Sequence, residues 1–143
     1  MAEGHRIPAI SIRQPWAELI LRGTKTMEVR KWHDAYRGPL WVHTGLRPDG
    51  HACVEYALRD PSMSELFTGG FVGLVELTAI ISFDARCWED LRPEHLDTGS
   101  FRPRLFGFFL KHARRLRRPV EAKGDLGLFY PDTELQTTLA GML

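Results

Sequence analysis

The chain has 143 residues, a length that fits one domain and suffices to bury a single core. Hydrophobic residues make up 43% and charged residues 26%, as in an ordinary globular protein, and no stretch approaches the roughly 20 apolar residues of a membrane helix. The composition therefore excludes a membrane-spanning protein. We expect one domain over residues 1–143, with its core at about 7–130 and a weakly specified tail at 131–143.

The N-terminus and the two cysteines give no sign of secretion or of a metal. Residues 1–16 lack the apolar run, about 7–15 residues long, that follows a basic segment in a secretory signal. Cys53 and Cys87 lie far apart and outside any CxxC or Cys/His cluster, which predicts neither a disulfide framework nor a zinc site. We expect a cytoplasmic protein with no cofactor and no membrane partner.

Charge is unevenly distributed, although the net charge is only +1. Residues 98–120 hold seven basic residues and no acid, whereas the rest of the chain holds 12 basic and 18 acidic residues. A basic segment on an acidic body is typical of a protein that binds an anionic polymer, but a solvated basic loop would have the same composition. The seven basic residues are Arg102, Arg104, Lys111, Arg114, Arg115, Arg117 and Arg118.

The first predicted elements are a helix, a glycine and a strand in immediate succession. Residues 15–22 predict a helix, because Pro15 suits its first position and Gly23 supplies the stop. Residues 26–32 alternate as a half-buried strand does, with Glu28 and Arg30 on one face. Strict alternation puts Lys25 on the other face. Lys25 can share a site with Glu28 and Arg30 only if it lies in the turn before the strand or if a bulge rotates the chain between them.

The later elements are mostly strands. We expect strands at 40–44 and 71–83, the second one curved at Gly73, and short helices at 51–59 and near 88–96. Residues 105–116 are ambiguous, but their aromatics and Gly107 favour a bent strand, and two short strand-like pieces flank Lys123 and Gly124. This pattern favours an α+β, β-dominated fold, a small bent β-barrel with short helices packed on its outside, over a doubly wound sheet.

The group formed by Lys25, Glu28 and Arg30 is the strongest candidate site, since no GxGxxG, P-loop, HExxH or GxSxG motif is present. A lysine and a carboxylate in a partly dry cleft shift each other's pKa and divide acid and base roles. Glu and Arg side chains equally read the polar edge of a nucleobase. An ordinary ion pair on a surface strand is the third interpretation.

A second set of candidates consists of isolated residues. Glu76 interrupts the apolar run 71–83, where a charge is costly unless it lies at an edge or faces a cavity. His43 is the only histidine we single out, and a structural role is the more common one. The aromatics able to stack on a base are Trp16, Trp32, Trp41 and Tyr36, of which Trp32 and Trp41 are preferred because Trp16 lies on an apolar helix face.

Taken together, these segments resemble the ASCH (activating signal cointegrator homology) domain, a member of the PUA-like group. The shared pattern is a serine, a basic residue and Gln-Pro-Trp-Ala, then Gly-x-Lys-x-x-Glu-x-Arg, then Arg-Gly-x-Leu, and finally a Pro and a Lys-Gly pair. The matching residues are Ser11, Arg13, Gln14, Pro15, Trp16, Ala17, Gly23, Lys25, Glu28, Arg30, Arg37, Gly38, Leu40, Pro119, Lys123 and Gly124. The resemblance implies a PUA-like β-barrel with helices at its rim and a cleft around the Gly-x-Lys-x-x-Glu-x-Arg segment.

The resemblance also implies a function, since ASCH domains are generally regarded as RNA-binding or DNA-binding modules. We accordingly expect a base or nucleotide beside Lys25, Glu28 and Arg30, RNA or single-stranded DNA as the partner, and phosphates along residues 102–118. The expected nucleic-acid contacts are Gln14, Trp16, Lys25, Glu28, Arg30, Trp32, Trp41, Arg114, Arg115, Arg117, Arg118 and Lys123.

Some proteins of this family are enzymes, including a bacterial ribonuclease and an amidohydrolase that deacylates N4-acetylated cytidine. The amidohydrolase uses a lysine, a threonine three residues later and a glutamate on a following strand. Lys25 and Glu76 match, but Glu28 replaces the threonine, and a carboxylate does not replace a hydroxyl that forms an acyl-enzyme. The alternative function is a metal-independent hydrolase of RNA or of a modified nucleoside that uses Lys25, Glu28 and Glu76. A protein-docking module is the third.

Overall fold

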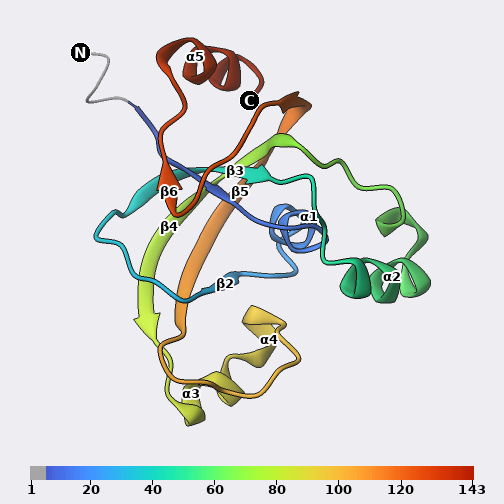
Figure 1. The fold of residues 1–143 in the computed structure, drawn as a ribbon, viewed down its shortest axis with the longest axis vertical. Coiled ribbons are helices and arrows are strands. Elements are labelled where there is room, and N and C mark those ends of the chain that lie inside the picture. The colour runs from blue at the N-terminus through green and yellow to red at the C-terminus, as the bar shows by residue number, and fades with distance from the viewer. Residues whose placement is uncertain (1–5) are drawn as a thin grey trace.

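The computed structural model describes residues 6–143, and its centre is one six-stranded mixed sheet (Figure 1). The strand order is β2-β5-β4-β3-β1-β6, and only β1 and β3 run parallel. The strands are β1 (Ala9–Ser11), β2 (Met27–Arg30), β3 (Gly38–Thr44), β4 (Gly70–Ser82), β5 (Phe106–Glu121) and β6 (Leu128–Phe129). The sheet bends into a half-barrel, which confirms the predicted β-dominated α+β fold.

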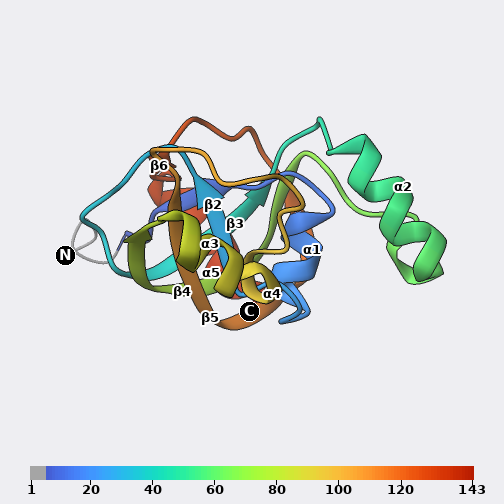
Figure 2. The same ribbon diagram turned by 90° about the horizontal axis from the view of Figure 1, so that it is seen from below.

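Short helices surround the sheet and connect its strands. They are α1 (Trp16–Leu21), α2 (Gly50–Arg59), the 3-10 helix η2 (Pro61–Met63), α3 (Ala85–Asp90), α4 (Arg92–His95) and α5 (Thr133–Gly141). Figure 2 shows that α2 extends away from the sheet, whereas α1, α3 and α4 lie close to it. Among the described helices, none combines the length and the apolar character that crossing a membrane requires.

The predicted succession of helix, glycine and strand is present at α1 and β2. Pro15 immediately precedes the helix, and Gly23 follows it with a φ of 79°, a value that glycine adopts without a steric penalty. The chain then enters β2 four residues later. This short connection places the residues of the Gly-x-Lys-x-x-Glu-x-Arg segment at the junction between the helix and the edge of the sheet.

Strands β4 and β5 form the long curved pair on which the half-barrel is built (Figure 1). Their register shifts at three places, one of them between Phe71 and Gly73. A Cβ atom at Gly73 would lie 2.6 Å from the Arg114 carbonyl oxygen and 2.3 Å from Leu21 Cδ2. The bend that the sequence predicts at Gly73 is therefore confirmed, because only glycine lets β5 and α1 approach this closely.

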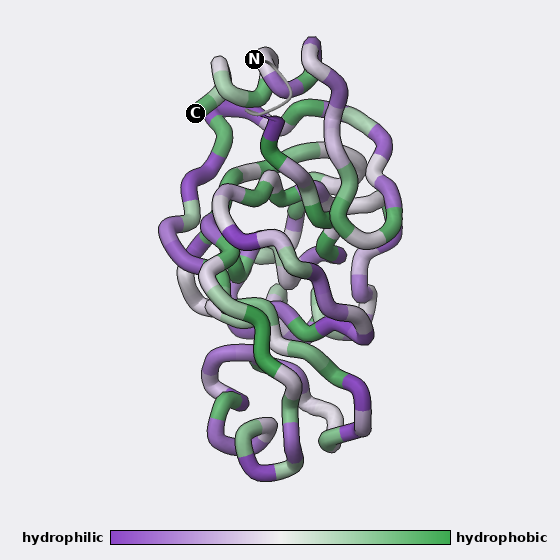
Figure 3. Tube along the Cα trace, turned by 90° about the vertical axis from the view of Figure 1, so that its left-hand side faces the viewer, coloured by the Kyte–Doolittle hydropathy of each residue, from purple (hydrophilic) through white to green (hydrophobic). Residues whose placement is uncertain are grey.

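The interior is divided into three apolar clusters. Helix α1 contributes Ala17 and Ile20 to the central cluster inside the sheet, and α3 contributes Trp88 to the cluster at its lower end. Figure 3 shows the colour alternating between hydrophobic and hydrophilic along the chain trace, as expected where one face of each strand is buried. These clusters fix the positions of the strand ends from which the candidate site is built.

The segment 131–143, expected to be a weakly specified tail, instead folds as helix α5 against the sheet. Asp132 caps its N-terminus by accepting a hydrogen bond from Leu135 N, and Leu139 is fully buried in a cluster with Trp41 and Phe71. Gln136 accepts a hydrogen bond from Trp41 Nε1 at 3.0 Å. The prediction failed because the nine-residue helix has a weak apolar periodicity and is stabilised by tertiary contacts.

Candidate functional site

Lys25, Glu28 and Arg30 meet at the start of β2. Lys25 lies in the turn after α1, where its backbone N–H donates to the Leu19 carbonyl. The Glu28 carboxylate stands between the two cations, 3.6 Å from Lys25 Nζ and 3.0 Å from Arg30 Nη2. The structure thus realises the first of the two arrangements that the strand periodicity allows, with the lysine in the turn.

The Lys25 end of this group is almost enclosed. Lys25 is only 4% exposed, its ammonium donates to the His95 carbonyl, and it lies 5.3 Å from the centre of the Trp16 ring. Burial lowers the pKa of Lys25, although Glu28 opposes the shift. The adjoining cavity of about 200 Å³ is also lined by Asp49 and Asp97, so with Glu28 three carboxylates face a single lysine there.

The Arg30 end faces a much larger space. Arg30 Nη2 donates to the Ser11 carbonyl at 2.6 Å, which joins the edge strand β2 to the end of β1. The Arg30 guanidinium forms an ion pair with Glu28, and Arg30 lines a broad cleft together with Trp32. The ion pairs that Glu28 forms with Lys25 and Arg30 therefore position the Arg30 guanidinium on the wall of that cleft.

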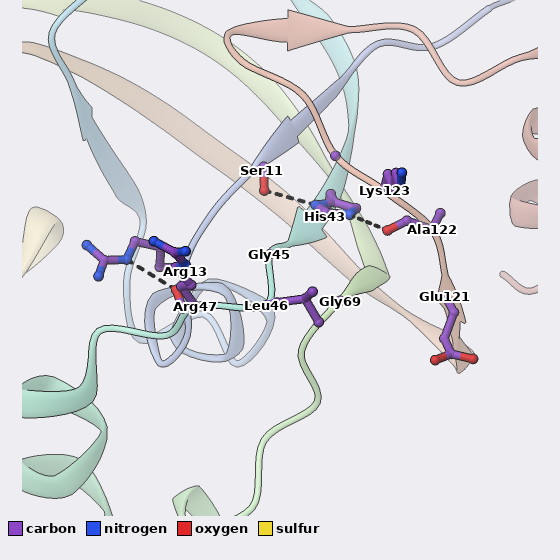
Figure 4. A pocket seen from close by; sticks show the side chains of 11 residues that line it. Ser11, Arg13, His43, Gly45, Leu46, Arg47, Gly69, Glu121, Ala122 and Lys123 are labelled. Carbon is purple, nitrogen blue, oxygen red and sulfur yellow. Dashed lines mark hydrogen bonds between the residues drawn. The ribbon is translucent and has the colours of Figure 1, made fainter.

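The cleft consists of two overlapping hollows of about 1020 and 770 Å³. Their shared residues come from three segments: the end of β1, the end of β3 and the loop between β5 and β6 (Figure 4). These residues are Ser11, Arg13, His43, Gly45 and Gly124. The volume of each hollow is in or near the range of about 300–1000 Å³ that ligand sites occupy, whereas the cavity beside Lys25 is below it.

Cations outnumber acids around the cleft. Arg13 and Arg47 lie on one rim, where Arg13 Nε donates to the Arg47 carbonyl at 3.3 Å, and Lys123 lies on the opposite loop (Figure 4). Together with Arg30 they provide four cations, against the two carboxylates of Glu121 and Asp125. The arrangement attracts an anion with more than one charge, since convergent cations focus the potential inside a concavity.

His43 forms the polar floor of the cleft. Its Nε2 lies 2.8 Å from the Ala122 carbonyl and its Nδ1 lies 2.9 Å from Ser11 Oγ (Figure 4). A carbonyl only accepts, so Nε2 carries the proton and Nδ1 accepts from the Ser11 hydroxyl. Burial lowers the pKa of His43, which favours the neutral ring. Gly124 packs against this ring, where an added Cβ would lie 2.5 Å from Cε1.

Five of the seven residues of the basic segment, from Lys111 to Arg118, lie on strand β5, whereas Arg102 and Arg104 precede the strand. Arg115 donates two hydrogen bonds of 2.8 Å to the Glu18 carboxylate, and Arg117 Nη2 donates to the Gly141 carbonyl. Burial alone would raise the pKa of Glu18, but the hydrogen bonds from Arg115 and Arg22 outweigh it and lower the pKa. Two of the four predicted phosphate-binding arginines therefore have structural partners, and Arg114 and Arg118 are exposed.

Three predicted site residues lie elsewhere than expected. Trp41 is buried in the α5 cluster and is unable to stack on a base. Gln14 is buried, with its amide donating to the Phe67 carbonyl and accepting from the Glu18 N–H, and it does not line the cleft. Glu76 is half exposed and faces His112 at 3.8 Å, outside the Lys25 cavity. Burial, which a local pattern does not reveal, decides the first two cases, and the exposed position of Glu76 decides the third.

Three further predicted residues line the observed hollows. Trp32 and Lys123 line the cleft, and Trp16 lines the small cavity beside Lys25. The sequence reasoning missed Ser11, Arg13 and Arg47 as cleft residues. Ser11 and Arg13 belong to the family pattern, which was the available signal. Arg47 carried no signal. Within residues 6–143, no three His, Cys, Asp or Glu side chains are grouped so as to hold a metal ion.

Solved structures of ASCH from Zymomonas mobilis share this fold. The crystal structure of ASCH from Zymomonas mobilis superposes with a TM-score of 0.69 at 16% identity, over 96% of this chain and 95% of that one. A substituted form of the same protein gives a TM-score of 0.68 at 16% identity, over 96% and 99%. At this identity the likeness establishes the fold.

Sequence relatives match over a shorter region. Activating signal cointegrator 1 from Mus musculus is 50% identical over 40 residues, and the Homo sapiens protein of the same name is 48% identical over 33 residues. These matches cover 27% and 23% of this chain but only 7% and 6% of the relatives. The model of the ASCH domain matches residues 10–120, from β1 almost to the end of β5. The chain therefore belongs to the ASCH domain family.

Proposed function

We propose that this protein binds single-stranded nucleic acid, with RNA as the leading candidate, and that the strand lies in the cleft above His43. The supporting observation is the contrast between the large cleft and the small cavity beside Lys25. The large cleft carries Arg13, Arg30, Arg47 and Lys123 on its walls, whereas the Lys25 cavity is small and acidic. A polyanion requires the first environment and is repelled by the second.

The cations of the cleft have separate tasks in this proposal. Arg47 and Lys123 are exposed on opposite rims and contact phosphates, which contributes affinity without sequence preference. Arg30 is held by Glu28 and by the Ser11 carbonyl, so its guanidinium has a fixed orientation suited to a base edge or a phosphate. Lys25 and Glu28 act on the ligand through Arg30.

Aromatic and apolar side chains at the cleft supply stacking surfaces. Trp32 lines the cleft beside Arg30 and has its ring fixed by an edge contact with Phe108 at 5.1 Å. Leu46 and Leu126, on the two rims, are 78% and 91% exposed. A base stacked on a tryptophan contributes about 1–3 kcal/mol. These contacts suit unpaired bases, because bases in a duplex stack on one another.

Fluorescence anisotropy with a labelled 12-nucleotide single-stranded RNA tests the proposal. Affinity is expected to fall steeply as salt rises, and Arg47→Glu combined with Lys123→Glu should abolish binding at moderate salt. The matched control is Arg59→Glu with Arg86→Glu, which changes the same charge on α2 and α3, outside the cleft. Equal losses in both double variants would reject the cleft and leave only a general charge effect.

A third double variant tests the role predicted for the basic segment. Arg114→Glu with Arg118→Glu reverses the two exposed arginines of β5 without breaking the Glu18 contact of Arg115. If these residues contact phosphates, the slope of log K against log salt should decrease by about 2. An unchanged slope would confine the phosphate contacts to the cleft. The alternative hydrolase with Lys25, Glu28 and Glu76 gains no support, since Glu76 lies outside the Lys25 cavity.

A further inference from the structure

The floor of the cleft contains a nucleophile, a base and an orienting group in hydrogen-bonding sequence. Ser11 Oγ lies 2.9 Å from His43 Nδ1, and His43 Nε2 lies 2.8 Å from the Ala122 carbonyl (Figure 4). The carbonyl fixes the tautomer in which Nδ1 is the acceptor, so the serine proton points at the base. Nucleic-acid binding alone requires no such arrangement.

The histidine is held rigidly while the serine faces the cleft. The His43 ring is 1% exposed and has edge contacts with Phe71 at 5.0 Å and Phe129 at 5.9 Å, and the Gly124 backbone packs closely against it. Ser11 is only half-buried and lines both hollows of the cleft. A fixed base behind an accessible hydroxyl is the geometry by which serine nucleophiles are activated.

We propose that Ser11 and His43 form a catalytic dyad that hydrolyses a carboxylic ester on a phosphate-bearing molecule, such as an acylated nucleotide. The choice of an acylated nucleotide rests on the proposed nucleic-acid cleft, whereas the dyad itself does not. Arg47 and Lys123 bind the phosphate, and Arg13 and Arg30 line the same hollow as Ser11. They supply N–H donors for a developing oxyanion.

The reaction proceeds through an acyl-serine. Ser11 Oγ forms a bond to the ester carbonyl carbon, and its proton moves to His43 Nδ1. The tetrahedral intermediate expels the alcohol oxygen, which takes that proton from His43. Water then attacks the acyl-serine, gives one proton to His43, and the returning proton restores the Ser11 hydroxyl as the carboxylic acid leaves. The Ala122 carbonyl stabilises the imidazolium in each step through its hydrogen bond from Nε2–H.

Two measurements on the full chain test the dyad. The first is labelling by a neutral fluorophosphonate, followed by peptide mass spectrometry, with an adduct expected on Ser11 in the wild type. The second is release of acetate from 3′-O-acetyl-AMP, compared with the uncharged 3′-O-acetyladenosine, where the phosphate should raise kcat/KM at least about tenfold. A preference for the uncharged ester would overturn the assignment of the cationic rim.

Variants separate the dyad from a structural role. Ser11→Ala should remove the adduct and lower kcat/KM at least about 100-fold, and His43→Gln should slow labelling similarly. Ser82→Ala, an exposed serine at the end of β4, is the matched control and should behave as wild type. If the His43→Gln variant does not fold, the Ser11→Ala variant alone determines whether the dyad is catalytic. Hydrolysis that survives Ser11→Ala, or a wild type without adduct and without acetate release, overturns the proposal. RNA binding by the wild-type protein is measured in a separate experiment. Because the labelling reaction involves no nucleic acid, a failure of the dyad and a failure of RNA binding are distinguishable.

Discussion

The Glu18 carboxylate on α1 accepts two hydrogen bonds of 2.8 Å from the Arg115 guanidinium on β5, 97 residues further along the chain. Arg22 Nε donates to the same carboxylate at 2.7 Å. A carboxylate with a side chain only 10% exposed and held by two guanidinium groups is a structural anchor between the helix and the sheet. It also explains why Arg115 is poorly available to a nucleic acid.

Replacing Glu18 by Gln should destabilise the protein by about 2–4 kcal/mol, because Arg115 and Arg22 both lose a charged partner. Urea unfolding followed by circular dichroism measures the change. The control is Glu55→Gln on the exposed face of α2, where the expected change is below about 0.5 kcal/mol. A loss below that limit for Glu18→Gln would show that the pair contributes nothing net.

Lys25 and Glu28 should respond very differently to substitution. Lys25→Met removes an ammonium that is costly to bury and leaves the Glu28–Arg30 contact in place, so we expect a change within about 1 kcal/mol or a stabilisation. Glu28→Gln removes the carboxylate that pairs with both Lys25 and Arg30 and should cost about 2–4 kcal/mol. Unfolding free energies of both single variants and the double variant give the coupling. A Lys25→Met variant as unstable as Glu28→Gln would contradict this account.

Gly124→Ala should disturb the loop that covers His43, because the added Cβ would lie 2.5 Å from the imidazole Cε1. We expect a destabilisation of about 1–3 kcal/mol and a loss of RNA affinity of at least tenfold. Gly50→Ala is the matched control, since nothing lies within 4 Å of a Cβ there. Thermal unfolding and anisotropy titration distinguish the two variants. Wild-type behaviour of Gly124→Ala would mean that the loop shifts at no cost.

Stability should fall when the pH is lowered from 7.5 to 5.5. Burial lowers the pKa of His43 and of His95 below the ordinary value of 6.5, so in this window the unfolded chain binds more protons than the folded protein. Each unit of lowered pKa contributes about 1.4 kcal/mol, lost as the pH falls from 6.5 to the folded pKa. Urea unfolding at both pH values should show a smaller loss in His43→Gln, and an undiminished one in His51→Gln, whose imidazole is 88% exposed.

Local patterns were sufficient for most of the fold. Gly23 and Pro15 bound α1 as expected, the alternation at 26–32 contains β2, and the long apolar run is β4. Residues 106–116 are part of β5, the longest of the described strands, which resolves the ambiguity of the segment 105–116 in favour of a strand. Each of these elements is determined by neighbours in sequence, which a period of 3.6 or 2.0 residues reveals.

Contacts between distant segments could not be predicted in this way. The pairing of His43 with Ser11 and with the Ala122 carbonyl joins three segments that are 32 and 79 residues apart. The burial of Trp41 depends on α5, almost a hundred residues later. The meeting of Lys25, Glu28 and Arg30 was predictable because all three lie within six residues, but their division between an acidic cavity and a basic cleft was not.

The pairing of β1 with β6 has a consequence for how the domain is made. Ala9 is paired with Phe129, so β1 gains its antiparallel neighbour only after about 120 further residues have been added. Until then the backbone edge of β1 on that side has no strand to bond. Loop closure over such a distance is entropically costly and slows folding. The edge of the sheet at β1 is therefore completed only by a contact between segments far apart in sequence, one of the contacts that form late in folding.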